Sequence, residues 1–328
     1  MLGRARQAVG TGLELCQRHV NAVADAALGQ LKPRLEHIMC RKGKRVRATM
    51  VYLLAGTNGE CDQQALERQS RVAASLEMLH LASLVHDDVI DESELRRGIF
   101  TANAEWGNKM AVLVGDYILS KSMELAVTEP DRRIPAILSS ASSQLVAGEV
   151  LEMDLAGKLD ATVEEYNAVI EGKTASLFDA CGRCGAILAG HNDATVTACG
   201  ELGRHFGMTF QIIDDLLDFG IGAGDLGKAK FSDLANGLVT LPILLYFSKC
   251  TPTERESMIA LLASASKEEQ GAAEAVKHAL DAAGAFDETM EIAMGHMQAA
   301  LKILNSLPDT PYRRLMAELS QTMVHRSH

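Results

Sequence analysis

The chain has 328 residues, 47% of them hydrophobic and 23% charged, so it is long enough to bury a large core. Acidic side chains outnumber basic ones by 43 to 32, and this net charge of −11 argues against nucleic-acid binding. The seven cysteines, an odd number scattered along the chain, favour reduced thiols and a cytoplasmic location over a disulfide framework. No uninterrupted apolar run approaches the roughly 20 residues of a membrane-spanning helix, so we expect no transmembrane segment. Residues 1–12 contain arginines but no serine, and they match an organellar transit peptide poorly.

Helices are predicted along almost the whole chain. Apolar residues recur at spacings of three and four, as in residues 71–86, and no proline lies between Pro135 and Pro242. Strand-like alternation is missing from the sequence. We therefore predict an all-α fold class with one domain over residues 1–328, in which long helices form a bundle around an aliphatic core. Turn-forming residues predict loops at 28–33, 127–133, 188–194, 220–227 and 307–313.

The first charged motif is basic and reads RKGKRVRA at residues 41–48. Lys44 and Arg47 are three residues apart and would share one face of a helix that begins near Gly43, while Arg45 would point elsewhere. The positive side chains and the helix N-terminus would together favour an anion. Taken alone, such a cluster is more often an ordinary surface patch.

Two acidic motifs follow at a distance from each other. The stretch LVHDDVIDESELRRG at 84–98 carries Asp87, Asp88 and Asp91 behind an apolar run. The stretch QIIDDLLDFG at 211–220 repeats this spacing with Asp214, Asp215 and Asp218. On a helix, the first and last aspartates of each motif would lie on one face about one turn apart.

Paired carboxylates of this kind favour a metal ion. Like charges one turn apart repel each other unless a cation lies between them. Mg²⁺ binds a few carboxylates and completes its shell with phosphate oxygens. A single DDxxD is usually a solvated helix end, but two copies behind apolar helices favour a metal site. Arg96 and Arg97 follow the first motif, and because consecutive side chains diverge, they suit two different anions.

These motifs resemble those of the all-trans polyprenyl diphosphate synthases, including the long-chain octaprenyl and solanesyl enzymes. The resemblance also includes YNAVIEGKTASLFDACGRCGA and FGMTFQIIDDLLDF, and it runs nearly end to end in the family's order. It implies the isoprenoid synthase fold, in which the two aspartate motifs face each other across a central cavity, usually in a homodimer. It further implies a Mg²⁺-dependent prenyltransferase that condenses isopentenyl diphosphate with an allylic diphosphate such as farnesyl or geranylgeranyl diphosphate, without a general base from the protein.

The resemblance assigns a role to each site residue. The metal ligands it implies are Asp87, Asp91 and Asp214, and the catalytic set also contains Asp88, Asp215, Asp218 and Lys173. The residues expected at the allylic diphosphate are Arg96, Lys173, Thr174, Gln211 and Lys228. The residues expected at isopentenyl diphosphate are Lys44, Arg47, His80 and Arg97. A lone histidine such as His80 is more often a hydrogen-bonded core residue, but its place two turns before Asp87 matches the family's ligand histidine.

Product length is also suggested by the resemblance, because the family's product tunnel runs beside the helix before the first aspartate motif. Ala82 and Ser83 are small there, which predicts an open tunnel and a long product of the kind attached to quinones. A shorter-chain synthase, a non-catalytic subunit of a heteromeric synthase and a terpene cyclase are the alternatives. The chain keeps both aspartate motifs, which argues against the second, and it carries the Lys44 and Arg47 cluster, which a cyclase does not need.

Three further features bear on this interpretation. Leu238 stands where many members have lysine, so one diphosphate contact is in doubt. GAGDLG at 222–227 fits a dinucleotide motif but follows an aspartate-bearing helix instead of a strand, and we interpret it as a flap that carries Lys228. The CxxC pair Cys181 and Cys184 has no second copy, which argues against zinc. The resemblance leaves open a peripheral membrane contact for product release.

Overall fold

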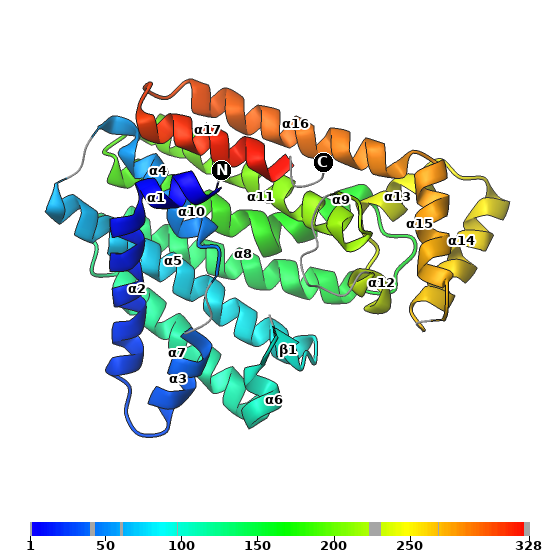
Figure 1. Ribbon diagram of the computed structural model, residues 1–328, viewed down its shortest axis with the longest axis horizontal. Helices are drawn as coiled ribbons and strands as arrows, with labels where there is room; N and C mark the ends of the chain where they lie inside the picture. The colour runs from blue at the N-terminus through cyan, green and yellow to red at the C-terminus, as the bar shows by residue number, and fades with distance from the viewer. Residues whose placement is uncertain are drawn as a thin grey trace. The chain divides into compact units, whose positions relative to one another are not determined.

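The computed structural model describes residues 2–39, 43–59, 62–96, 98–222, 231–267 and 269–324. Helices make up nearly all of this part of the chain, so the all-α prediction is confirmed (Figure 1). The strands among the described residues are the short β1 (Leu95–Arg96) and β2 (Ile99–Phe100), which pair antiparallel with Leu95 opposite Phe100. The helical pattern breaks close to the predicted loops, for example between Ala126 and Arg133.

The described residues pack as two compact units. Unit 1 comprises Met1–Ser142, Leu177–Gly203 and Ile303–Leu319. Unit 2 comprises Ser143–Ser176, Arg204–Lys302 and Ser320–His328. The single domain over residues 1–328 and its central cavity stay predictions.

Some elements lie within one unit and others have residues in both. Those within unit 1, besides β1 and β2, are α1 (Leu2–Ala8), α2 (Gly10–Asp25), α3 (Leu31–Met39), α4 (Val46–Ala55), η1 (Gly56–Asn58), α5 (Gln63–Ile90), α6 (Ala102–Trp106) and α7 (Asn108–Ala126). Those within unit 2 are α9 (Val163–Ile170), η2 (Glu171–Ala175), α12 (Ser232–Ala235), α13 (Leu241–Phe247), α14 (Pro252–Ala265) and α15 (Ala272–Ala282). Those with residues in both are α8 (Arg133–Leu155), α10 (Ser176–Leu188), α11 (Asp193–Asp218), α16 (Ala285–Asn305) and α17 (Pro311–Val324).

Helix α5 is the central helix of unit 1 and carries the first aspartate motif at its C-terminal end. It begins at a capping residue, Asp62, whose side chain accepts a hydrogen bond from the Ala65 N–H at 2.8 Å. Its middle is buried on most sides and packs against α2, α4 and α7. The apolar run in the sequence therefore buries the stem of the motif, as predicted.

Close contacts between helix backbones fix α10 in unit 1. A side chain at Gly185 would clash with Leu54 of α4, and one at Gly182 would clash with the Cys199 carbonyl of α11. Helix α10 is continuous through the CxxC pair, as predicted. Both thiols are buried and free, and burial raises the pKa of Cys181 and of Cys184, so reactive thiolates are disfavoured there.

The C-terminal half of α11 lies in the hydrophobic core of unit 2. Ile212 and Leu216 on α11 are fully buried in this core, which also contains apolar side chains of α13 and α15. Phe219 closes the end of the helix with its ring 5.4 Å from that of Phe286 and 6.2 Å from that of Phe231. The second aspartate motif therefore rests on a well-packed helix.

Helix α8 is, among the described residues, the helix that is long and apolar enough to cross a membrane. Its most apolar window has a mean hydropathy of 1.2, and 33% of that window is buried within the chain. We expected no transmembrane segment because the sequence has no long uninterrupted apolar run. In α8, serines and alanines separate the larger apolar residues. One helix of this kind is weak support for a membrane span, because core helices of globular proteins share these properties.

Candidate active site

The first aspartate motif closes helix α5. The Asp91 N–H donates to the Asp87 carbonyl at 2.8 Å, so the two residues are one turn apart, as predicted. Asp87 is half-buried and Asp91 is exposed at the helix end. Asp88 is 1% exposed, and one of its carboxylate oxygens accepts a hydrogen bond from Arg96 Nε at 2.6 Å. This charged partner compensates for the burial of the Asp88 carboxylate.

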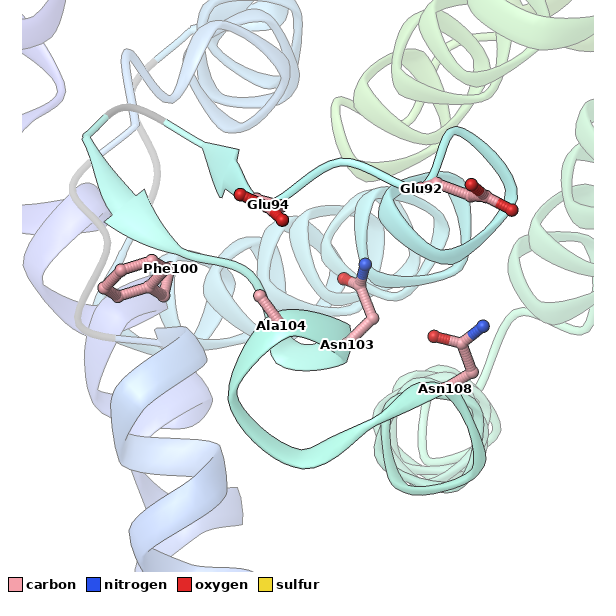
Figure 2. Close-up of a pocket in the computed structure, with 6 residues that line it drawn as sticks. All are labelled: Glu92, Glu94, Phe100, Asn103, Ala104 and Asn108. Atoms are coloured by element: carbon pink, nitrogen blue, oxygen red, sulfur yellow. The ribbon is translucent and has the colours of Figure 1, made fainter.

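A hollow of about 390 Å³ opens beside this motif (Figure 2). Glu92 has a left-handed backbone with φ of 50°, which turns the chain out of α5 into the β1–β2 hairpin. The Asn103 side-chain amide donates to the Ser93 carbonyl at 3.0 Å and ties α6 to this turn. Figure 2 shows Glu94 beside the hairpin, Asn103 on α6 and Asn108 on α7. The residues that line it are Glu92, Glu94, Phe100, Asn103, Ala104 and Asn108.

The second aspartate motif closes helix α11 in unit 2. Asp214 is half-buried, whereas Asp215 is 4% exposed. The two oxygens of Asp215 accept hydrogen bonds from the Tyr166 hydroxyl at 2.6 Å and from the Gln211 amide at 2.9 Å. Burial raises the pKa of Asp215 above its ordinary value, although these two hydrogen bonds lower it in part. Both oxygens of Asp215 are thus committed to neutral protein donors.

Asp218 is held by the start of another helix. Its carboxylate accepts from the Ser232 N–H at 3.0 Å and from the Ser232 hydroxyl at 2.6 Å, and it also accepts from the Asp233 N–H at 3.2 Å. These donors lie at the N-terminus of α12, where a negative charge is favoured. Asp218 therefore anchors the start of α12.

Of the predicted allylic-diphosphate residues of unit 2, Lys173, Thr174 and Gln211 are among the described residues. The Thr174 hydroxyl donates to the Gln211 side-chain oxygen at 2.8 Å. Lys173 is bound by two carboxylates of α8, with Nζ 2.9 Å from Glu149 Oε2 and a still shorter ion pair to Glu152. Burial lowers the pKa of Lys173, but Glu152 and Glu149 outweigh this and raise it above its ordinary value. Lys173 lies in η2, a π-helical turn of the kind common at functional sites.

The basic segment of unit 1 differs from the prediction in one respect. Helix α4 begins at Val46 and not near Gly43, because Arg45 has a left-handed backbone with φ of 53°. Lys44 therefore lies before the helix, and the prediction that Lys44 and Arg47 share one helix face is wrong. Arg45 does point elsewhere, as predicted, because it binds Glu77 at 3.0 Å.

Glu77 explains why the helix begins where it does. This buried side chain of α5 accepts a hydrogen bond from the Ala48 N–H at 3.0 Å while it binds Arg45. It thereby satisfies a free N–H group in the first turn of α4. The α4 N-terminus is thus occupied by a protein carboxylate, which weakens the predicted role of that N-terminus as an anion site.

Arg47 lies in the first turn of α4, and its guanidinium stacks on the Phe178 ring of α10 at 4.6 Å. Burial lowers its pKa, and within the described part of the chain its Nε atom has no hydrogen-bond partner. His80 lies on α5 two turns before Asp87. On the same helix Ala82 is buried, and the half-buried Ser83 donates to the His80 carbonyl at 2.9 Å.

Two predicted ligands, Arg97 and Lys228, lie outside the described residues, and so does most of the GAGDLG segment. The other predicted residues divide between the units. Unit 1 contains Lys44, Arg47, His80, Asp87, Asp88, Asp91 and Arg96. Unit 2 contains Lys173, Thr174, Gln211, Asp214, Asp215 and Asp218.

Comparison with known proteins identifies the family. The family model described as Polyprenyl synthetase matches residues 29–280, which is most of the chain. The chain belongs to the polyprenyl synthetase family. It is 34% identical over 324 residues to octaprenyl diphosphate synthase of Escherichia coli, a match that covers 95% of this chain and 97% of that protein. Members of this family are prenyltransferases that condense isopentenyl diphosphate with allylic diphosphates and use a divalent metal.

Solved structures of polyprenyl synthases share the fold. The crystal structure of a decaprenyl diphosphate synthase from Rhodobacter capsulatus matches with a TM-score of 0.91 and 31% identity, covering all of both chains. The polyprenyl synthase of Caulobacter crescentus, solved with calcium and isoprenyl diphosphate, matches with a TM-score of 0.89 and 29% identity. This match covers 100% of this chain and 98% of that chain.

Sequence reasoning missed three polar residues around the sites of this polyprenyl synthetase. Tyr166 binds Asp215, and Glu149 and Glu152 bind Lys173. The sequence held one signal for the glutamates, since a buried lysine is rare unless it is paired. Tyr166 gave no such signal, because its partner is 49 residues away along the chain.

Proposed function

We propose that the chain is a Mg²⁺-dependent synthase that condenses isopentenyl diphosphate with an allylic diphosphate to make a long-chain all-trans polyprenyl diphosphate. One observation carries the proposal. Each aspartate motif presents a half-buried first carboxylate, Asp87 or Asp214, beside a buried middle carboxylate that protein donors fix in place. Such supported carboxylates are preorganised ligands for a cation.

The donor set fits a hard divalent ion. The proposed ligands Asp87, Asp91 and Asp214 supply only carboxylate oxygens, which Mg²⁺ prefers. Within each unit, no three acidic, histidine or cysteine side chains of the described residues already form a metal cage. That suits Mg²⁺, which keeps several positions for water and substrate phosphate oxygens. When bound, the ion supplies positive charge to the departing diphosphate.

The protein's own residues complete the charge balance. Arg96, Lys173, Thr174, Gln211 and Lys228 are the proposed contacts of the allylic diphosphate, and Lys44, Arg47, His80 and Arg97 those of isopentenyl diphosphate. Cations and hydrogen-bond donors fixed in advance stabilise the negative charge that develops as diphosphate leaves. Apolar helix faces keep water from the allylic cation that remains. The departing diphosphate takes the final proton, so we assign no protein base.

Incubation of the purified protein with Mg²⁺, labelled isopentenyl diphosphate and either farnesyl or geranylgeranyl diphosphate tests this function. We expect labelled polyprenyl products that are absent when a chelator removes the metal. No incorporation with any allylic primer would overturn the proposal. Incorporation only after a second protein is added would favour a subunit of a heteromeric synthase.

The long product is proposed from the small residues Ala82 and Ser83 on α5, with the octaprenyl and decaprenyl synthases among similar proteins as further support. Ala82→Phe should shorten the product, because a ring would close the proposed tunnel beside α5. Ser83→Ala is the matched control and should leave product length unchanged. Chain length unaltered by Ala82→Phe on thin-layer analysis would overturn the tunnel assignment, and a short wild-type product would favour a geranylgeranyl or farnesyl diphosphate synthase.

We also infer a homodimer, and support for it comes from helix α8. Val146, Val150 and Met153 are spaced four and three residues apart and are each more than half exposed. They form an apolar strip on one helix face, which a second copy would bury. Light scattering should give twice the chain mass for the wild type and a monomer for Val150→Glu.

A reducing compartment such as the cytoplasm is the proposed location. The described cysteines Cys16, Cys181, Cys184, Cys199 and Cys250 are free, which fits reducing conditions. Release of a long polyprenyl product would bring the protein into peripheral contact with a membrane.

A further inference from the structure

Lys173 lies against helix α8 because two glycines let the backbones meet. A side chain at Gly172 would come within 2.9 Å of the Gln144 carbonyl oxygen, and one at Gly148 would clash with the Lys173 backbone nitrogen. This contact sets η2 directly on α8. Glu149 follows Gly148 and Lys173 follows Gly172 in the sequence. The close contact between these backbones therefore places the Lys173 ammonium next to the carboxylates of α8.

Two carboxylates share this one ammonium group. Lys173 Nζ lies 2.9 Å from Glu149 Oε2 and forms a shorter ion pair with Glu152. The Glu149 side chain is 8% exposed and that of Glu152 is 23% exposed, so water screens these charges only in part. The three side chains together carry a net charge of −1, because two negative groups surround one positive group.

This net charge bears on the ligand proposed for Lys173. A free ammonium would attract a diphosphate, whereas the ion triplet leaves the approaching anion facing a net negative charge. Thr174, the neighbour of Lys173 in the chain, donates a hydrogen bond to Gln211, and all three are proposed contacts of the same diphosphate. The two glutamates should therefore lower the affinity of Lys173 for the diphosphate that it is expected to bind.

We propose that Glu149 and Glu152 are positioning residues that fix the Lys173 ammonium and lower its affinity for diphosphate, which favours release of the diphosphate product. The proposal rests on the proposed function for the identity of the anion. It assigns no direct substrate contact to either glutamate. A purely structural ion pair would stabilise the contact between α8 and η2 without changing anion affinity.

Metal-free binding of inorganic pyrophosphate, measured by titration calorimetry, separates these two roles. Glu152→Gln keeps the size of the side chain and removes one negative charge. We expect it to tighten pyrophosphate binding by about tenfold, as removal of a nearby partly screened charge should. Glu149→Gln should act in the same direction. Glu171→Gln is the matched control, since Glu171 lies in the same turn, is 48% exposed and faces Arg204, and it should leave the affinity unchanged.

Two lysine variants complete the test. The double variant Glu152→Gln with Lys173→Met should bind pyrophosphate no more tightly than the wild type, because the glutamates act through the Lys173 ammonium. In the wild type, Lys173→Met alone should weaken metal-free pyrophosphate binding by about tenfold, because it also changes the local charge by one unit and leaves both carboxylates uncompensated. A folded Glu152→Gln protein with unchanged or weaker pyrophosphate affinity would overturn the proposal, and so would a gain that persists without Lys173. Binding is measured without turnover, so an inactive protein that follows this pattern would contradict the prenyltransferase proposal alone.

Discussion

The two aspartate motifs have the same spacing in the sequence and different surroundings in their units. The middle residue of the first, Asp88, is balanced by a cation, Arg96, at 2.6 Å. The middle residue of the second, Asp215, has the neutral donors Tyr166 and Gln211 instead, and its burial raises its pKa. The same pattern of residues therefore gives one carboxylate that charge stabilises and another that hydrogen bonds hold in an apolar core.

The outer aspartates differ as well. Asp91 is exposed at the end of α5, whereas Asp218 is occupied by the N–H groups and hydroxyl at the start of α12. Asp87 and Asp214, the first aspartates of the two motifs, are both half-buried. The ligand set Asp87, Asp91 and Asp214 that the family resemblance implies stays a prediction.

The largest expected effect follows from removing the first carboxylate of either motif. Asp87→Asn and Asp214→Asn should each lower kcat/KM for labelled isopentenyl diphosphate incorporation by about 1,000-fold or more, because each removes charge that holds the metal against the leaving diphosphate. Asp160→Asn, at an exposed turn position outside both motifs, is the control. Wild-type activity in either motif variant would show that the substituted carboxylate is not needed for the metal-dependent reaction.

A smaller loss of activity should follow from removing the neutral donor of the second motif. Tyr166→Phe deletes the hydroxyl that binds Asp215 and should lower kcat about tenfold, a size typical of residues that orient metal ligands. Tyr246→Phe, on α13 of the same unit, should leave kcat unchanged. Equal kcat values for the two variants would show that Tyr166 does not position the motif.

The middle aspartates should differ in their effect on stability. Asp88→Asn removes the partner of Arg96 and should lower the free energy of unfolding by about 2 kcal/mol. Asp215→Asn removes a charge that burial disfavours, and an amide can still exchange hydrogen bonds with Tyr166 and Gln211, so its unfolding temperature should equal or exceed that of the wild type. Urea and thermal unfolding of both variants measure this. A similar loss of stability in both variants would mean that burial affects the Asp88 and Asp215 carboxylates in the same way.

The smallest expected effect is a change in the pH dependence of stability, and it concerns a histidine pair between α11 and α16 in unit 2. His205 Nδ1 and His296 Nδ1 are 2.9 Å apart, and burial together with the charges of His205 and Arg204 lowers the pKa of His296 from 6.5 to about 4. The unfolded chain therefore binds a proton between these pH values that the folded chain does not, and stability should be lost as pH decreases from 6.5 towards 4. His296→Gln should reduce the difference between the unfolding temperatures at pH 7 and pH 5. An unchanged difference would show that this histidine is not buried in its neutral form.

The sequence predicted those features that depend on local pattern. The apolar spacing that predicts helices is confirmed in α5 and α11, and with it the one-turn separation of Asp87 and Asp91. The hairpin β1–β2 escaped prediction because two-residue strands are too short to show alternation. The membrane-like hydropathy of α8 escaped it because no uninterrupted apolar run is present.

Features that depend on distant partners could not be predicted. The predicted start of helix α4 was wrong because Arg45 has a left-handed backbone. Arg45 binds Glu77, which is 32 residues away along the chain. Glu149 and Glu152 could not be connected to Lys173 without the contact between Gly148 and Gly172. In each case a side chain from another helix decides the local structure, and periodicity within one segment carries no information about it.

We propose that both aspartate motifs bind metal ions that contact one diphosphate. A crystal structure of the protein with Mn²⁺ and pyrophosphate, in which anomalous scattering locates each ion, tests it most directly. We expect ions bound by Asp87 and Asp91 and by Asp214, all in contact with one pyrophosphate. Ions on only one motif, or two motifs that face separate surfaces, would contradict it.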